Sequence, residues 1–331
     1  MTAKLSSGIR FRRWVGNQLI NALFRSVSAA ARLHPKARLS SHGVEKLSNL
    51  AYTDSGDKHH RLDVYRPVER RGPLPVVLFV HGGSFRLFSK DVHWLMGLQF
   101  ARYGAVVFSI NYRLAPGHRF PSGVEDAANA LLWVQKHAHE YGGDPEQLIL
   151  AGESAGGNLV STLALQRSHS IETPWSQAIF EANPSIKAVI PGCAALQVTK
   201  MKRYLEGQQH SLIVRDRLQE LERAYLPPTG VPEGMKYLAD PLLFFESEAE
   251  IERPLPPFFL FAGTADPILN DTERMEAALK KRGVDCEARY YEKGVHSFHA
   301  LIFQKIAQDC WRDQFAFLDR VLDSDSNEEL V

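Results

Sequence analysis

A short apolar run that passes without a break into a glycine-rich turn restricts the fold more than any other feature. Residues 148–151 read Leu-Ile-Leu-Ala, and the next six read Gly-Glu-Ser-Ala-Gly-Gly. The apolar run is typical of a buried strand, and a helical pattern follows at 156–167. A serine on a tight strand-to-helix turn needs small neighbours, because bulky ones would block the sharp bend. The pattern therefore predicts a strand, a strained turn at Ser154 and a helix.

The same alternation of short apolar runs and longer amphipathic stretches extends over most of the chain. The predicted strands are 62–65, 75–80, 105–110, 148–151, 187–190, 257–262 and 287–291. The predicted helices are 92–103, 123–141, 156–167, 272–282 and 301–322. Fully apolar strands separated by helices indicate an α/β fold, with a mostly parallel central sheet flanked by helices on both faces.

Two segments interrupt the alternation. Residues 1–48 are predicted to be largely helical, and residues 197–250 contain a helical pattern at 215–225 followed by a proline-rich turn. We expect both segments to form a helical cap, so that the core comprises residues 49–196 and 251–331.

A serine hydroxyl is a weak nucleophile and requires a base and an orienting acid. In a fold of this kind the acid follows the serine along the chain, and the histidine comes last. Asp266 ends one predicted strand and His296 follows the last one, so both belong at the edge of the sheet that carries Ser154. His299 is the rival base, whereas Asp271 is better placed to cap the next helix.

A second glycine-rich loop follows the strand at 75–80, where residues 81–85 read His-Gly-Gly-Ser-Phe. Consecutive glycines let backbone amides approach a substrate oxygen closely. The amides of Gly82, Gly83 and Ala155 are therefore the predicted oxyanion hole. We interpret His81 as a structural residue that holds the loop.

Four stretches in this order resemble one known family. They are 81–85, then 111–121 (Asn-Tyr-Arg-Leu-Ala-Pro-Gly-His-Arg-Phe-Pro), then 152–157, and finally 266–271 together with His296-Ser297-Phe298. With these motifs the chain resembles the hormone-sensitive-lipase-like family of carboxylesterases, bacterial family IV. The resemblance implies an α/β-hydrolase fold with a cap, the Ser154–His296–Asp266 triad, and no metal or cofactor.

Three positions depart from the pattern of that family. Ser84 stands where a third glycine is usual, Glu153 replaces an Asp or Thr, and Ser297 replaces a glycine. Burial would raise the pKa of the Glu153 carboxyl group. The candidate substrate-binding residues are Ser84, Phe85 and Glu153 beside the motifs, and Phe11 and Trp14 in the cap.

Charge is distributed unevenly along the 331 residues. Eight basic residues and no acidic one precede Glu45, whereas the rest of the chain has 31 basic and 38 acidic residues. The overall charge of +1 argues against a nucleic-acid-binding protein. Three cysteines without close spacing suit a reducing, cytoplasmic location. No apolar run reaches the roughly 18 residues of a membrane span, and no secretory signal pattern is present.

The basic segment before Glu45 also has the pattern of an amphipathic helix. Its apolar residues recur at spacings of one, three and four: Phe11, Trp14, Val15, Leu19, Ile20, Leu23, Phe24 and Val27. Three interpretations remain: an organellar transit peptide, a helix in peripheral contact with an anionic membrane, and part of the cap. We favour the cap, because the apolar stripe needs a partner.

The function predicted from these residues is serine-dependent hydrolysis of short- to medium-chain carboxylic esters through an acyl-enzyme. Two alternatives remain: an amidase or arylformamidase with the same triad, and a non-catalytic receptor like the plant gibberellin receptors, which lose the histidine. Related enzymes often form homodimers through the last strand and helix.

Overall fold

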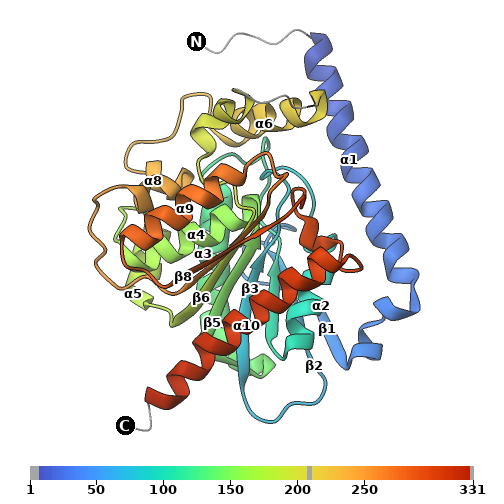
Figure 1. Cartoon of the computed structure of the whole chain (residues 1–331), viewed down its shortest axis with the longest axis vertical. Helices are drawn as coiled ribbons and strands as arrows, with labels where there is room; N and C mark the ends of the chain where they lie inside the picture. Colours follow the sequence, from blue (N-terminus) through green and yellow to red (C-terminus); the bar gives the residue numbers. More distant parts are fainter. Residues whose placement is uncertain (1–6, 207–210, 329–331) are drawn as a thin grey trace.

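An eight-stranded sheet forms the centre of the protein, with strand order β1-β2-β4-β3-β5-β6-β7-β8 (Figure 1). The computed structural model describes residues 7–206 and 211–328. Strand β2 is antiparallel to β1 and β4, and the strands from β4 to β8 pair in parallel. The predicted mostly parallel sheet is therefore confirmed. The strands are β1 Val44–Ala51, β2 Arg61–Pro67, β3 Leu74–Val80, β4 Val106–Ile110, β5 Gly143–Glu153, β6 Ile186–Gly192, β7 Phe258–Gly263 and β8 Cys286–Tyr291.

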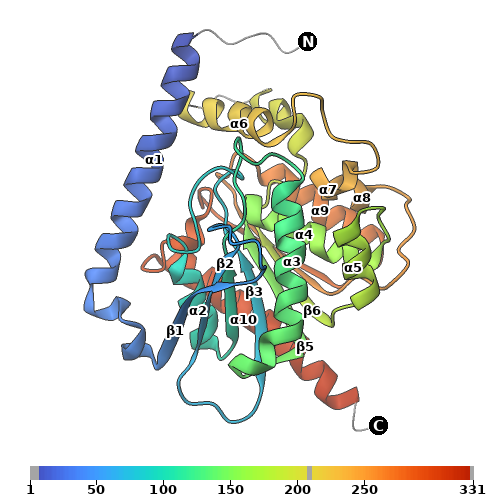
Figure 2. The ribbon, with the colours of Figure 1, turned by 180° about the vertical axis from the view of Figure 1, so that it is seen from behind.

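Helices cover both faces of this sheet (Figures 1 and 2). They are α1 Ser7–Leu33, α2 Trp94–Tyr103, α3 Ser122–His137, α4 Ala155–Ser168, α5 Pro174–Ala182, α6 Leu212–Tyr225, α7 Lys236–Ala239, α8 Pro241–Glu246, α9 Leu269–Lys281 and α10 Lys305–Glu328. Short 3₁₀ helices include η4 Val198–Leu205 and η5 Phe298–Ala300. Helices α2 and α10 pack on one face, whereas α3, α4, α8 and α9 pack on the other.

Alternation along the buried strands produces two hydrophobic cores. In β3, Val76 and Leu78 face the core under α3 and α4, whereas Val77 and Phe79 face the core under α2 and α10. Because successive side chains of a strand point to opposite faces, a strand covered on both sides must be apolar throughout. This explains why β3 reads as a continuous apolar run.

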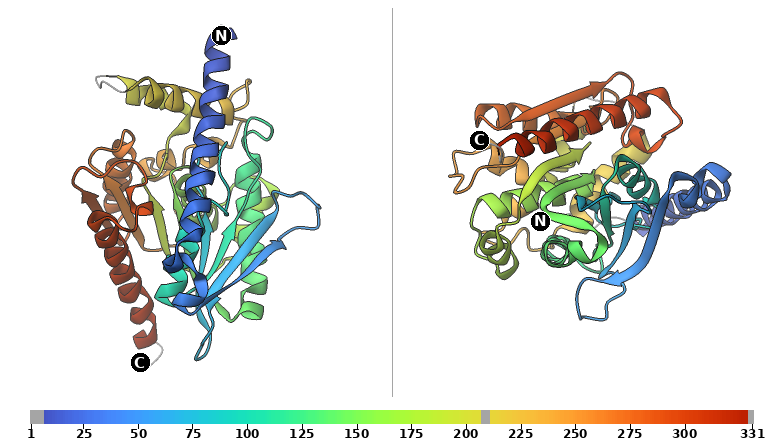
Figure 3. Two further views of the ribbon diagram at one scale, coloured as in Figure 1. Left: turned by 90° about the vertical axis from the view of Figure 1, so that its right-hand side faces the viewer. Right: turned by 90° about the horizontal axis from the view of Figure 1, so that it is seen from below.

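Helix α6 lies across the end of the sheet where the loops after the parallel strands gather, and α1 runs along the outside of the molecule (Figures 1 and 3). Phe120 N donates to Tyr225 O at the end of α6, over 2.8 Å. Arg12 of α1 lies 3.0 Å from Asp216 of α6. The two segments expected to form the cap therefore meet beside the loops of the sheet.

Several boundaries differ from the sequence-based expectations. Strand β1 begins at Val44, inside the segment expected to be helical, and its half-exposed residues pair with β2 across a register shift. Helix α10 begins at Lys305 rather than 301, because residues 298–300 form η5. Helix α8, within the range 197–250, packs against α4 and α9 and buries Phe244 and Phe245. These elements depend on contacts with distant residues, so local periodicity did not reveal them.

Candidate active site

Ser154 occupies the strained turn that the sequence predicts between β5 and α4. Its φ and ψ angles are 52° and −115°, a conformation that costs free energy for any residue other than glycine. A Cβ at Gly156 would lie 2.0 Å from the Val80 carbonyl oxygen, and one at Gly152 would lie 2.6 Å from the Gly156 backbone. Only glycine therefore fits on either side of Ser154, because the turn presses against the end of β3.

Asp266 and His296 lie together on the loops that follow β7 and β8. Asp266 Oδ2 lies 2.8 Å from His296 Nδ1, and Asp266 Oδ1 accepts a hydrogen bond from the Ile268 amide over 2.9 Å. Since the carboxylate is an acceptor, Nδ1 of His296 carries the proton and Nε2 is left as the basic nitrogen. The Asp266 carboxylate is fully buried, whereas 35% of the His296 side chain is exposed.

The residues after β6 connect this pair to the serine turn. The Ser154 amide donates to Gly192 O over 2.9 Å, and the Ala195 amide donates to Ser154 O over 3.2 Å. Between these two residues, Cys193 presents its sulfur within 4.8 Å of ligand atoms of both Asp266 and His296. The three predicted residues Ser154, Asp266 and His296 are therefore brought to one edge of the sheet.

Opposing influences act on the pKa of His296. Burial lowers it, but the negative charge of Asp266 and the hydrogen bond to that residue raise it, with a smaller contribution from Glu153. The net pKa of His296 lies above the ordinary value for histidine. Burial and the charge of Asp266 raise the pKa of the neighbouring Cys193 thiol well above its usual value. Cys193 is therefore a neutral thiol, not a competing nucleophile.

The loop after β3 contains the predicted oxyanion residues. Within the described residues, the amides of Gly82 and Gly83 donate no hydrogen bond to the protein. Ala155 is the first residue of α4, where amides have no partner within the helix. A Cβ at Gly83 would lie 2.2 Å from the Leu87 carbonyl oxygen, at a φ of 116°. The loop therefore requires glycine there and leaves amides available for an anionic oxygen.

Two of the departures from the family pattern share one backbone conformation. Ser84 and Ser297 have φ angles of 55° and 58°, in the left-handed region that glycine occupies most easily. The resembled family usually has glycine at both positions. The substitutions by serine therefore keep the loop shapes at some cost in conformational energy.

Phe85 packs against α6 rather than into an open space. It is 1% exposed, and its ring stacks on Tyr225 of α6 with centroids 3.7 Å apart. Its carbonyl oxygen also accepts the Ala115 amide over 2.8 Å. Phe85 thus links the oxyanion loop to α6, and any effect on substrate would act through that contact.

The expected rise in the pKa of Glu153 is wrong, whereas its contact with substrate stays a prediction. The side chain contacts histidines of two neighbouring loops: Oε1 lies 2.8 Å from His93 Nε2 and Oε2 lies 3.0 Å from His299 Nε2. Burial does raise the pKa of this carboxyl group, but the two histidines outweigh burial and hold it well below its usual value. The sequence did not show these partners, because they lie far along the chain.

The other residues singled out from the sequence are His299, Asp271, Phe11 and Trp14. His299 contacts Glu153 and not Asp266, so it does not take the place of His296. Asp271 does not cap α9; its buried carboxylate accepts the amides of Leu196 and Gln197 over 2.7 and 3.1 Å. Phe11 and Trp14 lie in α1, but their side chains are outside the part of the chain that the structure describes.

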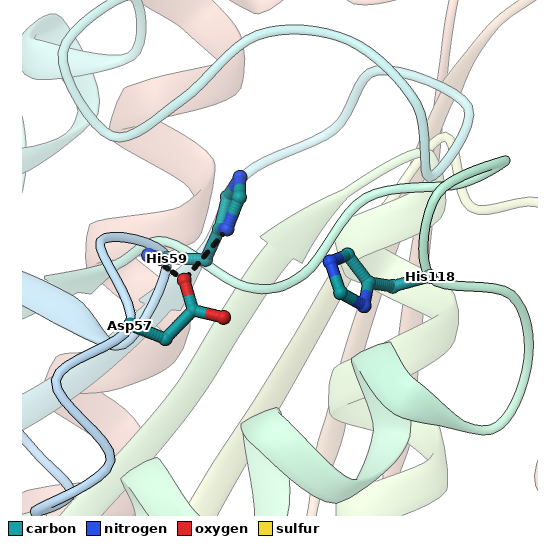
Figure 4. Close-up of side chains that lie close together, drawn as sticks. All are labelled: Asp57, His59 and His118. Atoms are coloured by element: carbon teal, nitrogen blue, oxygen red, sulfur yellow. Dashed lines mark hydrogen bonds and ion pairs between the residues drawn. The ribbon is translucent and has the colours of Figure 1, made fainter.

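A second cluster of potential metal ligands lies apart from these residues, in the loops that precede β2 and α3. Asp57, His59 and His118 present ligand atoms within 4.8 Å of one another (Figure 4). Asp57 Oδ1 already accepts the His59 amide over 2.8 Å and lies 2.9 Å from His59 Nδ1. These contacts account for the positions of Asp57 and His59 without an ion.

Comparisons with known proteins agree with this fold. A family described as the α/β-hydrolase fold matches residues 77–300. The carboxylesterase NlhH of Mycobacterium tuberculosis is 27% identical over 86% of this chain and 82% of its own length. The acetyl esterase of Salmonella schwarzengrund is 28% identical over 80% of this chain and 77% of its own. The esterase of Pyrobaculum calidifontis is 25% identical with a TM-score of 0.71, covering 92% of both chains.

Among the described helices, none combines the length and the apolar character needed to cross a membrane. The family match covers about two thirds of the chain, including both glycine-rich turns, Asp266 and His296. The chain therefore belongs to the α/β-hydrolase fold family, and its resemblance to the hormone-sensitive-lipase-like carboxylesterases is confirmed.

Proposed function

We propose that this protein hydrolyses carboxylic esters, with Ser154 as nucleophile, His296 as base and Asp266 as the orienting acid. The Asp266–His296 pair beside the strained Ser154 turn is the observation that carries the proposal. Relatives that are carboxylesterases and acetyl esterases support ester hydrolysis.

The reaction proceeds in two halves. Ser154 Oγ attacks the ester carbonyl while His296 Nε2 takes its proton, and the resulting oxyanion accepts hydrogen bonds from the amides of Gly82, Gly83 and Ala155. The bond to the alkoxy oxygen then breaks as His296 returns the proton to the leaving alcohol. Water, deprotonated by His296, attacks the acyl-enzyme and releases the acid and Ser154. Asp266 stabilises the imidazolium in both halves.

The substrates are esters with short to medium acyl chains. Helix α6 lies over the loops at this edge of the sheet, where Phe85 stacks on Tyr225, and we expect this cover to limit the length of the acyl chain. The acetyl esterase among the relatives agrees with a small acyl group. Activity on p-nitrophenyl esters should therefore peak at acetate to hexanoate, and a steady rise to palmitate would contradict the short-chain preference.

Helices α1 and α6 form the cap in this proposal. Residues 1–48 and 197–250 supply them, and the pair Arg12–Asp216 links the two helices. Peripheral membrane contact through the basic α1, a homodimer and a cytoplasmic location remain predictions. Leu19, Leu23 and Val27 of α1 are 58–65% exposed, so the apolar stripe is largely uncovered.

The test of the proposed function is the Ser154→Ala variant. We expect loss of at least about 10⁴-fold in kcat, because triad nucleophiles act as part of a unit with their base. A fluorophosphonate probe should label wild-type Ser154 and not the variant. A variant with wild-type esterase activity would exclude this mechanism, and a wild type that binds ligands without labelling would support the receptor alternative. Matched ester and anilide substrates separate an esterase from an amidase.

A further inference from the structure

Glu153 is a buried carboxylate clamped between two histidines from distant parts of the chain. His93 Nε2 lies 2.8 Å from one carboxylate oxygen and His299 Nε2 lies 3.0 Å from the other. All three residues are less than 8% exposed. The surrounding side chains are mostly apolar: Phe79, Met96, Phe100, Ile190, Phe261 and Trp311.

The hydrogen-bond geometry determines the protonation state of His93. His93 Nε2 faces the carboxylate, and His93 Nδ1 lies 3.1 Å from the Ser89 carbonyl oxygen. Both neighbours are acceptors only, so both ring nitrogens of His93 carry protons and the ring is a cation. The pKa of His93 agrees, since Glu153 raises it against the opposing effect of burial.

Glu153, His93 and His299 each belong to a different loop of the candidate active site. Glu153 directly precedes Ser154, and a Cβ at Gly82 would lie 3.1 Å from Glu153 Oε1. His93 ends the loop that begins with the oxyanion glycines, and its ring stacks on His81 with centroids 5.4 Å apart. His299 follows His296 by three residues, within η5. One carboxylate thus touches all three loops.

We propose that Glu153, His93 and His299 act as a positioning unit that holds the oxyanion loop and the His296 loop against the Ser154 turn. This inference rests on the proposed function. Its residues do not touch the reacting atoms; they act through Gly82, Ser154 and His296.

Stability alone does not require such a unit. A buried ion pair in apolar surroundings contributes little to stability compared with well-packed apolar side chains of similar volume. Fixing three loops within a fraction of an ångström, however, raises the rate, since a displacement of about 1 Å in a catalytic group can cost roughly 100-fold. The unit lies where this precision has most effect.

The decisive comparison uses Glu153→Gln, His299→Gln and His299→Leu. In Glu153→Gln the side-chain amide has only one acceptor oxygen, so it releases one of the two histidines. We expect kcat on p-nitrophenyl acetate to fall about 10- to 100-fold with KM changed less than about threefold. The glutamine of His299→Gln can still donate an N–H to Glu153, whereas the leucine of His299→Leu cannot. His299→Gln should therefore stay within about threefold of wild type and His299→Leu should resemble Glu153→Gln.

The pH profile separates positioning from a general loss of structure. Two groups whose charges matter here are His296 and Glu153. The charged and titratable groups near His296 are Asp266 and Cys193. Those near Glu153 are His93, His299, His81 and Tyr112. Because the Glu153 charge contributes to the raised pKa of His296, Glu153→Gln should move the acid limb of kcat/KM to lower pH. Fluorophosphonate titration gives the fraction of competent protein.

His60→Gln is the matched control, because His60 Nε2 lies 3.0 Å from the buried Asp126 carboxylate, apart from the three loops. It should lower the melting temperature without changing kcat or the acid limb. Equal kcat for His299→Gln and His299→Leu would overturn the positioning unit. So would a loss of kcat that is fully explained by a smaller fraction of protein labelled by the fluorophosphonate. Both outcomes can be read from the His299 variants even where Glu153→Gln does not fold. A wild type that neither labels nor hydrolyses esters would overturn the proposed function as well.

Discussion

The carboxyl edge of the sheet and helix α1 are held in place by very different interactions. At the sheet edge, the buried carboxylates of Asp266 and Glu153 each contact a histidine, and glycines are packed directly against backbone. Along α1, Leu19 and Leu23 are 65% and 60% exposed, and the contacts are single ones such as Phe24 on Phe88. Each residue of a site that must keep its geometry is held by several contacts at once. An outer helix with fewer contacts can shift without disturbing the site.

The largest expected effect belongs to the Asp266–His296 pair. Asp266→Asn keeps the size of the side chain but removes the charge and the acceptor that hold His296 in one tautomer. We expect kcat to fall about 10³- to 10⁴-fold, in line with the same change in other triads. Steady-state kinetics with p-nitrophenyl acetate measures this, with the melting temperature as a control. A loss under about tenfold would show that His296 is oriented by something else.

A glycine contact in the oxyanion loop should give the next largest effect. Gly83→Ala places a Cβ 2.2 Å from the Leu87 carbonyl oxygen at a φ of 116°, so the loop must move. We expect kcat to fall about 100-fold or more, because removing one oxyanion donor alone costs roughly 10²–10³-fold. Gly72→Ala, at a φ of 96° with open space around it, serves as a matched control and should keep the activity.

The pH dependence follows from the raised pKa of His296. His296 must be unprotonated to act as a base, so activity is lost as the pH falls through its pKa. Since the net effect of burial, Asp266 and Glu153 places that pKa above the ordinary value, the acid limb of kcat/KM should lie above about pH 6.5. Initial rates from about pH 5 to 9 measure it, and a limb below about pH 6 would contradict the assignment.

Deleting residues 1–33 removes helix α1 and tests how much the active site depends on it. Because the described contacts of α1 with the loop after β3 are individual side-chain contacts, such as Phe24 on Phe88 and Ser28 on the Val92 carbonyl oxygen, we expect kcat on acetate esters to stay within about fivefold. The preference among acyl chains should change, since α1 and α6 together form the proposed cap. A transit peptide predicts an unchanged enzyme, so identical chain-length profiles would favour that interpretation.

The smallest effect should come from the ion pair that joins α1 to α6. The Arg12 side chain is 57% exposed, so water screens its attraction to Asp216. Arg12→Ala should therefore change the free energy of unfolding by about 0.2–1 kcal/mol. Urea unfolding at low and high salt measures this change, and a larger loss would show that the cap is held more firmly than its contacts indicate.

Most of the sheet could be predicted from the sequence, but the edge strand β1 could not. Each predicted strand from 62–65 to 287–291 is present, and β3, β4 and β7 have the clearest pattern because strands buried on both faces must be apolar throughout. Strand β1 was missed, since its mixed polar and apolar residues have no such pattern and it forms only because β2 pairs with it. Helix α8 was missed for a similar reason, because its apolar side chains are buried only by packing against α4 and α9.

Short segments of sequence were enough to predict Ser154, Asp266 and His296 as a triad, because each stands at or just after the end of a strand. The partners of Glu153 could not be identified in this way. His93 lies 60 residues before it, and His299 follows β8, the last strand along the chain. Their meeting depends on strand order and on the register between parallel strands. A sequence motif specifies the turn, whereas the electrostatic surroundings of the turn arise when distant loops are packed together.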